Sequence, residues 1–206
     1  MRKKHLAGLV ILAAVAGCAK YTIVPPAVDL TALGTLGLVT FKAENAKGDL
    51  DGAATQYFLQ EVTAAQRVPV VELGLPDAVL ADVGKQAFDR DAALAIGEKQ
   101  GVEAFFLGEV SVTKVKPQVD LLAPLSKAIF ARAAFDISVT VRLISAANGA
   151  TLWTDSIIRQ GTVGAIGMED GVPVFAVRDK STAMDSVLRE IMFRLTWDFR
   201  QTRRRL

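Results

Sequence analysis

Apolar and polar residues alternate along much of the chain in patterns that predict strands. Short apolar runs bounded by glycine, proline or asparagine are typical of buried strands. Strict alternation is typical of a strand with one buried face, as where Ile137, Val139 and Val141 alternate with Ser138 and Thr140. These patterns predict five strands, over residues 36–41, 68–73, 102–114, 135–144 and 151–162.

Helical spacing of apolar residues predicts the helices between and after these strands. Asp49 precedes the first helix and Asp89 or Asp91 the second, and each suits the N-cap position. Gly101 suits the position just after the second helix, where a left-handed backbone is common. The predicted main helices are 50–66, 92–100 and 179–200, with a short helix or turn over 76–83.

The order of these elements predicts an α/β fold. Two helical crossovers make the first three strands parallel. Asn148-Gly149 is typical of a two-residue turn, which makes the last two strands an antiparallel hairpin. We therefore expect a single α/β domain over residues 33–201, with a mixed five-stranded sheet and three main helices. Residues 117–131 and 163–177 lack a regular pattern and are predicted to be loops.

The N-terminal segment has the pattern of a secretory signal peptide. Three basic residues, Arg2, Lys3 and Lys4, precede an apolar run over residues 6–17. That run is shorter than the roughly 20 residues that a membrane-spanning helix needs. A basic start followed by a short apolar run predicts a signal peptide, here over residues 1–17.

The end of this segment resembles the lipobox of bacterial lipoproteins, in which the cysteine receives a diacylglycerol and the leader is cut before it. The resemblance implies lipid attachment at Cys18 and signal-peptidase recognition of the three residues before it, Val15, Ala16 and Gly17. Ala19 follows the cysteine, which in a Gram-negative cell favours the outer membrane over the inner membrane.

Removal of the signal peptide changes the charge and the available chemistry. The full chain has 24 basic and 22 acidic residues, and loss of the leader's three basic residues leaves 21 against 22, a net charge of −1. His5 is the sole histidine and Cys18 the sole cysteine. The mature chain therefore lacks the groups for Ser-His-Asp or Cys-His catalysis and for metal sites built from histidine or cysteine. We expect no catalytic residue, no metal, no cofactor and no enzymatic activity.

Two strings, Gly101–Val110 and Val139–Trp153, resemble a superfamily of bacterial lipoproteins. The superfamily includes the curli-secretion (CsgG-like) lipoproteins, the amino-terminal domain of TolB and the lipoprotein activators of penicillin-binding proteins. Its members share a strand that ends in a glycine, here Gly108, and a strand pair whose turn is followed by a tryptophan, here Gly149 and Trp153.

This resemblance covers roughly residues 33–200 and implies a fold like the TolB amino-terminal domain, of the anticodon-binding-domain-like type. It also implies an envelope protein that forms rings or docks onto partner domains. We expect a non-enzymatic outer-membrane lipoprotein that serves as a periplasmic assembly or scaffolding component. The alternatives are a lipoprotein activator that regulates a cell-wall-synthesis enzyme and a carboxylate-dependent envelope hydrolase.

The expected partners are the membrane, through the N-terminal lipid, and an unidentified envelope protein. A homo-oligomer is compatible with the resemblance, and export excludes nucleic acid. Residues 18–32, which contain Pro25-Pro26, are predicted to be a lipidated tether, with an edge strand against the domain as the alternative. Residues 202–206 are predicted to be a basic tail, for which a solvated end is favoured over contact with anionic lipid or an acidic partner. The arginines of this end are Arg200, Arg203, Arg204 and Arg205.

Acidic residues are the remaining candidates for chemistry. The pairs Asp49/Asp51 and Asp89/Asp91 could bind a cation or transfer protons. N-capping and favourable charge at a helix N-terminus explain both pairs more simply. Glu109 is interpreted as a charge at a sheet edge.

The tryptophans and one group of glycines are interpreted as structural. Trp153 and Trp197 are expected in the core. A group of glycines lacks the lysine of a phosphate-binding loop and is interpreted as a flexible loop. These glycines are Gly161, Gly164, Gly167 and Gly171.

Overall fold

The computed structural model describes residues 21–44, 49–112, 116–119, 131–169, 172–176 and 180–205. The predicted signal peptide and its lipobox, including Cys18, lie outside these residues. The chain divides into two units, one made from its two ends and one formed by Ala27–Arg200. Within the described residues, none of the helices has the length and hydrophobicity needed to cross a bilayer.

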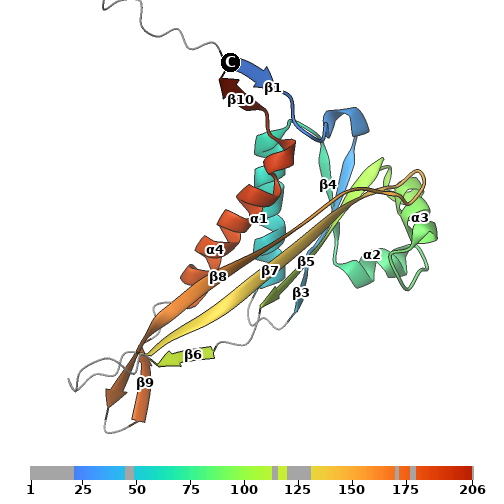
Figure 1. The fold of residues 1–206 in the computed structure, drawn as a ribbon. Helices are drawn as coiled ribbons and strands as arrows, with labels where there is room; N and C mark the ends of the chain where they lie inside the picture. Colours follow the sequence, from blue (N-terminus) through green and yellow to red (C-terminus); the bar gives the residue numbers. More distant parts are fainter. Residues whose placement is uncertain are drawn as a thin grey trace, which may run out of the picture. The chain divides into compact units, whose positions relative to one another are not determined.

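An eight-stranded mixed sheet forms the centre of the larger unit in the described part of the chain (Figure 1). Its strands are β2 (Leu36–Val39), β3 (Lys42–Glu44), β4 (Val70–Gly74), β5 (Ala104–Val112), β6 (Lys116–Val119), β7 (Ala131–Ser145), β8 (Thr151–Glu169) and β9 (Val172–Ala176). The strand order is β4-β2-β5-β7-β8-β9, with β3 paired to β5 and β6 paired to β7. β2 runs parallel to both β4 and β5, and the pairs from β5 to β9 are antiparallel. The predicted α/β class, the mixed sheet and the parallel first strands are confirmed.

The sheet has more and longer strands than the sequence predicts. β7 begins at Ala131, and β8 continues to Glu169. The two strands stay paired as far as Ala131 and Ile166. β9 then lies within the predicted loop 163–177. The flexible-loop interpretation is wrong for Gly161, Gly164 and Gly167, which lie on β8, and Gly171 is outside the described residues. Backbone hydrogen bonds continue a ladder even where side chains do not alternate, so periodicity misses such extensions.

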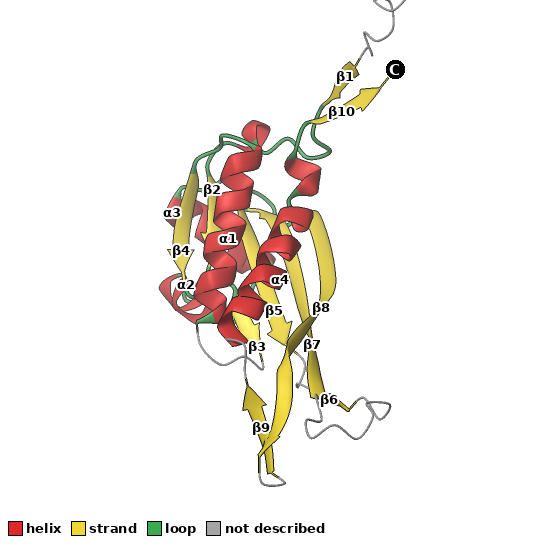
Figure 2. Cartoon of the chain, turned by 90° about the vertical axis from the view of Figure 1, so that its left-hand side faces the viewer, coloured by secondary structure: helices red, strands yellow, loops and turns green. Residues whose placement is uncertain are grey.

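Helices cover both faces of the sheet in the described residues. They are α1 (Leu50–Ala65), α2 (Pro76–Asp82), α3 (Arg90–Gln100) and α4 (Lys180–Leu195), with 3-10 turns η2 (Thr31–Leu33) and η3 (Trp197–Phe199). Figure 2 shows α1 and α4 side by side over one face, and the views of Figures 1 and 2 place α2 and α3 on the other. The buried residues form two clusters that match these layers.

Two helix boundaries show how local chemistry sets the ends. Asp89 accepts a hydrogen bond from the Ala92 N–H at 2.8 Å, and Gly101 closes α3 with a left-handed φ of 65°, so both predicted caps are confirmed. The last helix ends at Leu195 rather than at residue 200. The Thr196 hydroxyl donates back to the helix carbonyls, an interaction that bends or ends helices.

A row of aromatic rings runs through the larger core cluster, and we call it the aromatic row. Neighbouring ring centroids lie 5.3, 5.0, 5.9 and 4.8 Å apart, within the range of favourable edge and tilted contacts. The row joins the segment between β2 and β3, then α1, β5, η3 and β8. Its members, in spatial order, are Phe41, Phe58, Phe106, Phe199 and Trp153.

Gly108 makes room for one end of this row. A Cβ atom at Gly108 would lie 2.2 Å from the Phe41 ring, so any larger residue on this part of β5 would displace that ring. The Phe41 N–H is fixed in turn by the Thr55 hydroxyl of α1, at 2.9 Å. The glycine that closes the apolar run of β5 is therefore required by close packing.

The points where the chain enters and leaves the larger unit are joined by one side chain. The Gln66 amide accepts from the Leu30 N–H at 2.8 Å and donates to the carbonyls of Val28 and Phe199 at 2.7 and 3.0 Å. A backbone bond from the Val28 N–H to the Asp198 carbonyl, at 3.1 Å, lies beside it. We call this group the Gln66 clamp.

The β7–β8 hairpin closes with a wider turn than the predicted two residues. Residues 146–150 connect the strands, and the Ser145 N–H donates to the Ala150 carbonyl at 2.8 Å. The Asn148 side chain accepts from the Ala150 N–H at 2.9 Å. This side-chain hydrogen bond stabilises the wider turn, which stands where the sequence predicted a two-residue turn.

The smaller unit is a two-stranded antiparallel ribbon of β1 (Tyr21–Val24) and β10 (Thr202–Arg205). These segments fall in the predicted tether and basic tail. The alternative of a strand within residues 18–32 agrees with β1, although β1 pairs with β10 and not with the eight-stranded sheet; β10 does not follow from the sequence pattern. An isolated pair of short strands buries little surface, so its hydrophobic and polar residues need not alternate as those of a core strand do.

We predict that Gly149→Ala destabilises the protein more than Gly84→Ala. Both glycines have a left-handed backbone, with φ of 74° and 67°, which costs an alanine about 1 kcal/mol or more. Only at Gly149 would the new Cβ meet a backbone atom, the Arg90 Cα at 2.8 Å, whereas the space around Gly84 is open. This contact should add about 1–3 kcal/mol to the loss.

Urea denaturation of both variants measures the difference in free energy of unfolding. Gly84→Ala is the matched control because it carries the backbone cost without the contact. Equal losses for the two variants would show that Arg90 does not pack against the hairpin turn.

Candidate functional site

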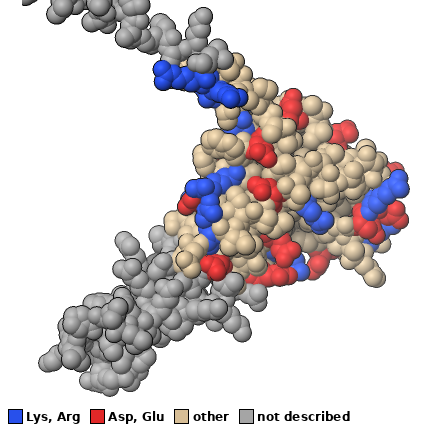
Figure 3. Space-filling model, viewed as in Figure 1, with Lys and Arg blue, Asp and Glu red and all other residues tan. Residues whose placement is uncertain are grey.

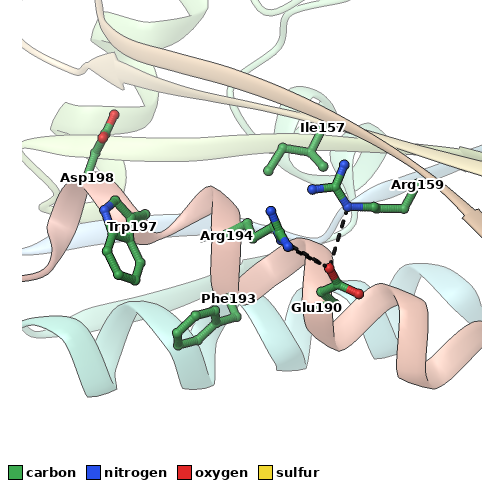
Figure 4. Close-up of a pocket in the computed structure, with 7 residues that line it drawn as sticks. All are labelled: Ile157, Arg159, Glu190, Phe193, Arg194, Trp197 and Asp198. Carbon is green, nitrogen blue, oxygen red and sulfur yellow. Dashed lines mark hydrogen bonds and ion pairs between the residues drawn. The ribbon is translucent and has the colours of Figure 1, made fainter.

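A hollow of about 750 Å³ lies between α4, η3 and β8 (Figure 4). We call it the α4–β8 groove. β8 contributes a wall on one side, and α4 with η3 contributes the other. Its lining residues are Ile157, Arg159, Glu190, Phe193, Arg194, Trp197 and Asp198.

The groove exposes two large aromatic rings from a helix that is anchored in the core. Leu188 and Ile191 of α4 are fully buried against the sheet. Helical periodicity then turns Phe193, and Trp197 just beyond the helix, outward, where they are 43% and 53% exposed. Their ring centroids lie 6.0 Å apart in an edge-to-face contact. Paired exposed rings on a fixed helix are unusual on the surface of a monomer and are typical of binding surfaces.

One carboxylate in the groove holds two guanidinium groups. Glu190 Oε1 accepts a hydrogen bond from Arg194 Nε at 3.1 Å, and it forms ion pairs with Arg194 Nη2 at 3.0 Å and Arg159 Nε at 3.6 Å. The second carboxylate, Asp198, accepts from the Trp153 indole N–H at 3.1 Å. One oxygen of each acid is thus engaged, and Arg159 and Arg194 keep guanidinium N–H donors that these contacts do not use. Figure 4 shows this charged group at one end of the groove and the aromatic pair at the other.

A second, smaller hollow of about 210 Å³ lies beside β3, β5 and β7. Glu109 lines it on β5, between β3 and β7, so the sheet-edge interpretation of this residue is wrong. Lys42 lines it too, and a side-chain hydrogen bond with Glu44, whose carboxylate lies 3.1 Å away, raises the pKa of Lys42.

The aspartate pairs have structural positions. Asp49 stands at the N-cap of α1 without a side-chain cap bond, and Asp51 lies in the first turn. Asp91 lies 3.7 Å from Lys85. Among the described residues, no group of three or more histidine, cysteine or acidic side chains is placed to hold a metal ion.

The two tryptophans have different environments. Trp153 is 8% exposed and belongs to the aromatic row, as predicted. The core interpretation of Trp197 is wrong, because the helix ends before it and η3 turns its ring outward.

Arg200 belongs to the core unit and not to the basic tail. It forms an ion pair with Glu61 of α1, and its guanidinium lies 4.7 Å from the centroid of the Phe193 ring. Six residues that line the groove were not predicted as site residues from the sequence: Ile157, Arg159, Glu190, Phe193, Arg194 and Asp198. The spacing of four residues in the pairs Glu190–Arg194 and Phe193–Trp197 is the signal that could have placed the members of these pairs on one outward helix face.

Known proteins resemble this chain in fold only at low similarity. Two structures of the PelC dodecamer from Paraburkholderia phytofirmans are 14% and 16% identical, cover 88% of this chain and 98% and 97% of theirs, and have TM-scores of 0.49 and 0.48. The LpoB C-terminal domain from Salmonella enterica is 13% identical, covers 73% of this chain and 90% of its own, and has a TM-score of 0.39. The lipoprotein GNA1162 from Neisseria meningitidis is 16% identical, covers 77% of this chain and 97% of its own, and has a TM-score of 0.34.

No protein-family model and no curated protein matches the chain. Similarity at the level of these structures carries no functional information. The resemblance to the CsgG-like and TolB domains stays a prediction from the sequence.

We predict that Trp153 and Trp197 differ in fluorescence emission wavelength and in quenching, because Trp153 is buried and Trp197 is exposed. Trp153→Phe leaves only the exposed Trp197, so emission should shift to longer wavelength and iodide should quench it several-fold more strongly. Trp197→Phe leaves only the buried Trp153 and should do the reverse. Similar spectra and quenching for the two variants would place Trp197 in the core and remove the apolar end of the groove.

Proposed function

We propose that this chain is a non-enzymatic lipoprotein of the bacterial cell envelope that works as an assembly component. In this proposal Cys18 carries the lipid, Ala19 favours the periplasmic face of the outer membrane, and the α4–β8 groove binds a partner protein. The observation that carries the proposal is the exposed Phe193–Trp197 pair at the groove, held by α4 and η3, which are anchored in the core through Leu188, Ile191 and Phe199.

The groove has the features of a protein-binding hot spot. Tryptophan and arginine are the side chains that most often dominate binding energy, and both line this hollow. Because α4 is fixed through Leu188 and Ile191, binding would cost little ordering of the helix. Exposed ion pairs such as Glu190–Arg194 contribute little stability, so the presence of this pair at a hollow suits recognition better than folding.

The groove also specifies the chemistry of its partner. An apolar or aromatic side chain fits against Phe193 and Trp197, and a carboxylate fits the spare N–H donors of Arg159 and Arg194. We therefore propose a segment of an envelope protein that carries an apolar side chain next to an acidic one. If that partner is a cell-wall-synthesis enzyme, the protein is an activator; otherwise it is a scaffolding component.

We predict that Cys18→Ala abolishes acyl labelling and releases the protein from membranes. The substitution removes the thiol that would accept the diacylglycerol. Labelled palmitate and membrane fractionation provide the measurements. Ala19→Asp is the matched control: it should keep the label and move the protein from the outer to the inner membrane fraction. Undiminished labelling of Cys18→Ala would refute the lipoprotein part of the proposal.

We predict that a photoreactive phenylalanine analogue at position 197 crosslinks to one envelope protein in intact cells. The same analogue in place of Leu75, which is 56% exposed on α2's N-terminal side, should give no such adduct. Arg159→Glu should lower the yield at position 197 by about ten-fold or more, because it removes a donor from the groove.

Arg67→Glu is the charge-matched control, since Arg67 is exposed and does not line the groove. It should leave the yield unchanged. Melting curves of both charge variants check that the fold is intact. Crosslinks that form equally at positions 75 and 197, or that survive Arg159→Glu, would mean that the groove is not the docking site.

A further inference from the structure

The β1–β10 ribbon places apolar and basic side chains on one face. Directly opposite residues of an antiparallel pair share a face, and successive residues alternate. The register pairs Tyr21 with Arg205 and Ile23 with Arg203. One face of the ribbon therefore carries Tyr21, Ile23, Arg203 and Arg205, and the other carries the pairs Thr22–Arg204 and Val24–Thr202.

The four residues on the first face are all exposed. Tyr21 and Ile23 are 61% and 66% exposed, and all three arginines of β10 are exposed as well. Neither strand contains an acidic residue. Figure 3 shows a continuous blue patch at the position of β10. Among the described residues, Arg203, Arg204 and Arg205 form no ion pair.

The distance along the chain from the lipid-attachment site is short. Tyr21 follows Cys18 by three residues. A fully extended chain spans at most about 3.6 Å per residue, so β1 begins within roughly 11 Å of the lipidated cysteine. This step rests on lipid attachment at Cys18, which belongs to the proposed function. A lipid in the bilayer then holds the ribbon at the membrane surface.

We propose that the Tyr21–Ile23–Arg203–Arg205 face of the ribbon binds the surface of a bilayer that contains anionic phospholipid. Tyrosine is enriched at the boundary between hydrocarbon and headgroups. An arginine keeps its guanidinium among the phosphates while its aliphatic stem covers apolar surface. Attachment through Cys18 raises the effective concentration of lipid at the ribbon, so a weak intrinsic affinity suffices to keep this face on the membrane.

An acidic protein partner would also attract three arginines. It would not explain why Tyr21 and Ile23 share their face with Arg203 and Arg205, in a segment held next to the bilayer. The combination of aromatic, aliphatic and basic side chains on one face is that of a segment at a membrane interface.

Fluorescent labelling of the lipidated protein tests the proposal. Lipid blocks the only native cysteine, so a cysteine introduced at position 23 or 22 is the sole free thiol and takes an environment-sensitive dye. The protein is reconstituted in vesicles that contain phosphatidylglycerol and a headgroup-labelled nitroxide lipid. We expect several-fold stronger quenching for Ile23→Cys, on the proposed face, than for its neighbour Thr22→Cys, on the other.

Two single charge changes on the same strand complete the test. Arg203→Ser in the Ile23→Cys background should lower the ratio of membrane-bound to free ribbon by about five-fold, since one basic residue near an anionic surface contributes roughly that factor. Arg204→Ser removes the same charge from the opposite face and should have a much smaller effect. Vesicles of phosphatidylcholine alone should weaken binding more than Arg203→Ser does, because they remove the attraction of Arg203 and Arg205 together.

Equal quenching at positions 22 and 23, or quenching that does not depend on phosphatidylglycerol, would overturn the proposed surface. An acidic protein partner instead predicts no quenching in these protein-free vesicles, which would overturn it too. Failure of the lipoprotein proposal has a separate signature, because the unsubstituted protein would then react with a thiol reagent at Cys18.

Discussion

Contact among the five rings of the aromatic row is the interaction on which the rest of the larger unit depends. It connects α1, β5, η3 and β8, elements that lie far apart in the sequence. Phe58 and Phe106 at its centre are fully buried, and each ring contributes a large apolar area to the core. A small residue at Gly108 is the geometric condition for this arrangement, because only there can the Phe41 ring lie directly on the strand.

The α4–β8 groove is a consequence of the same packing. Phe199 and Trp153 close the row, and the indole N–H of Trp153 bonds to Asp198 on the rim of the groove. The segment after α4 is therefore held by two contacts with Trp153, one from Asp198 and one from Phe199. Trp197 lies between these fixed points, at the start of η3, and is exposed. The exposed aromatic surface is thus produced by the way the core is filled.

The sequence predicted the parts of the fold that a periodic pattern encodes. The alternation of Ile137, Val139 and Val141 marked a buried strand face, and all three are fully buried. The extension of β8 through Gly164 was missed, because backbone pairing requires no particular side chains. The turn around Gly149 was placed correctly, but its width depends on one side-chain hydrogen bond.

The candidate site was harder to predict than the fold. Phe193 and Trp197 are residue types typical of a core. The helical position of Phe193 within α4 turns it outward, and the end of α4 at Leu195 determines where Trp197 lies. That end depends on three-dimensional contacts of Thr196 and Phe199. Lipid attachment, in contrast, is predicted from a contiguous sequence motif. Its recognition requires no knowledge of the fold, so Cys18 could be proposed from the sequence alone.

The Gln66 clamp has a mechanical consequence. It ties Val28, near the first residue of the larger unit, to Phe199, near its last. Force applied to either end of the chain therefore acts first on the same few hydrogen bonds. Gln66 transmits this force to the end of α1 before it reaches any strand. Bonds that share a load in this way must break together, which resists force better than bonds that open one after another. The strands of the sheet are thereby shielded from tension that arises outside the larger unit.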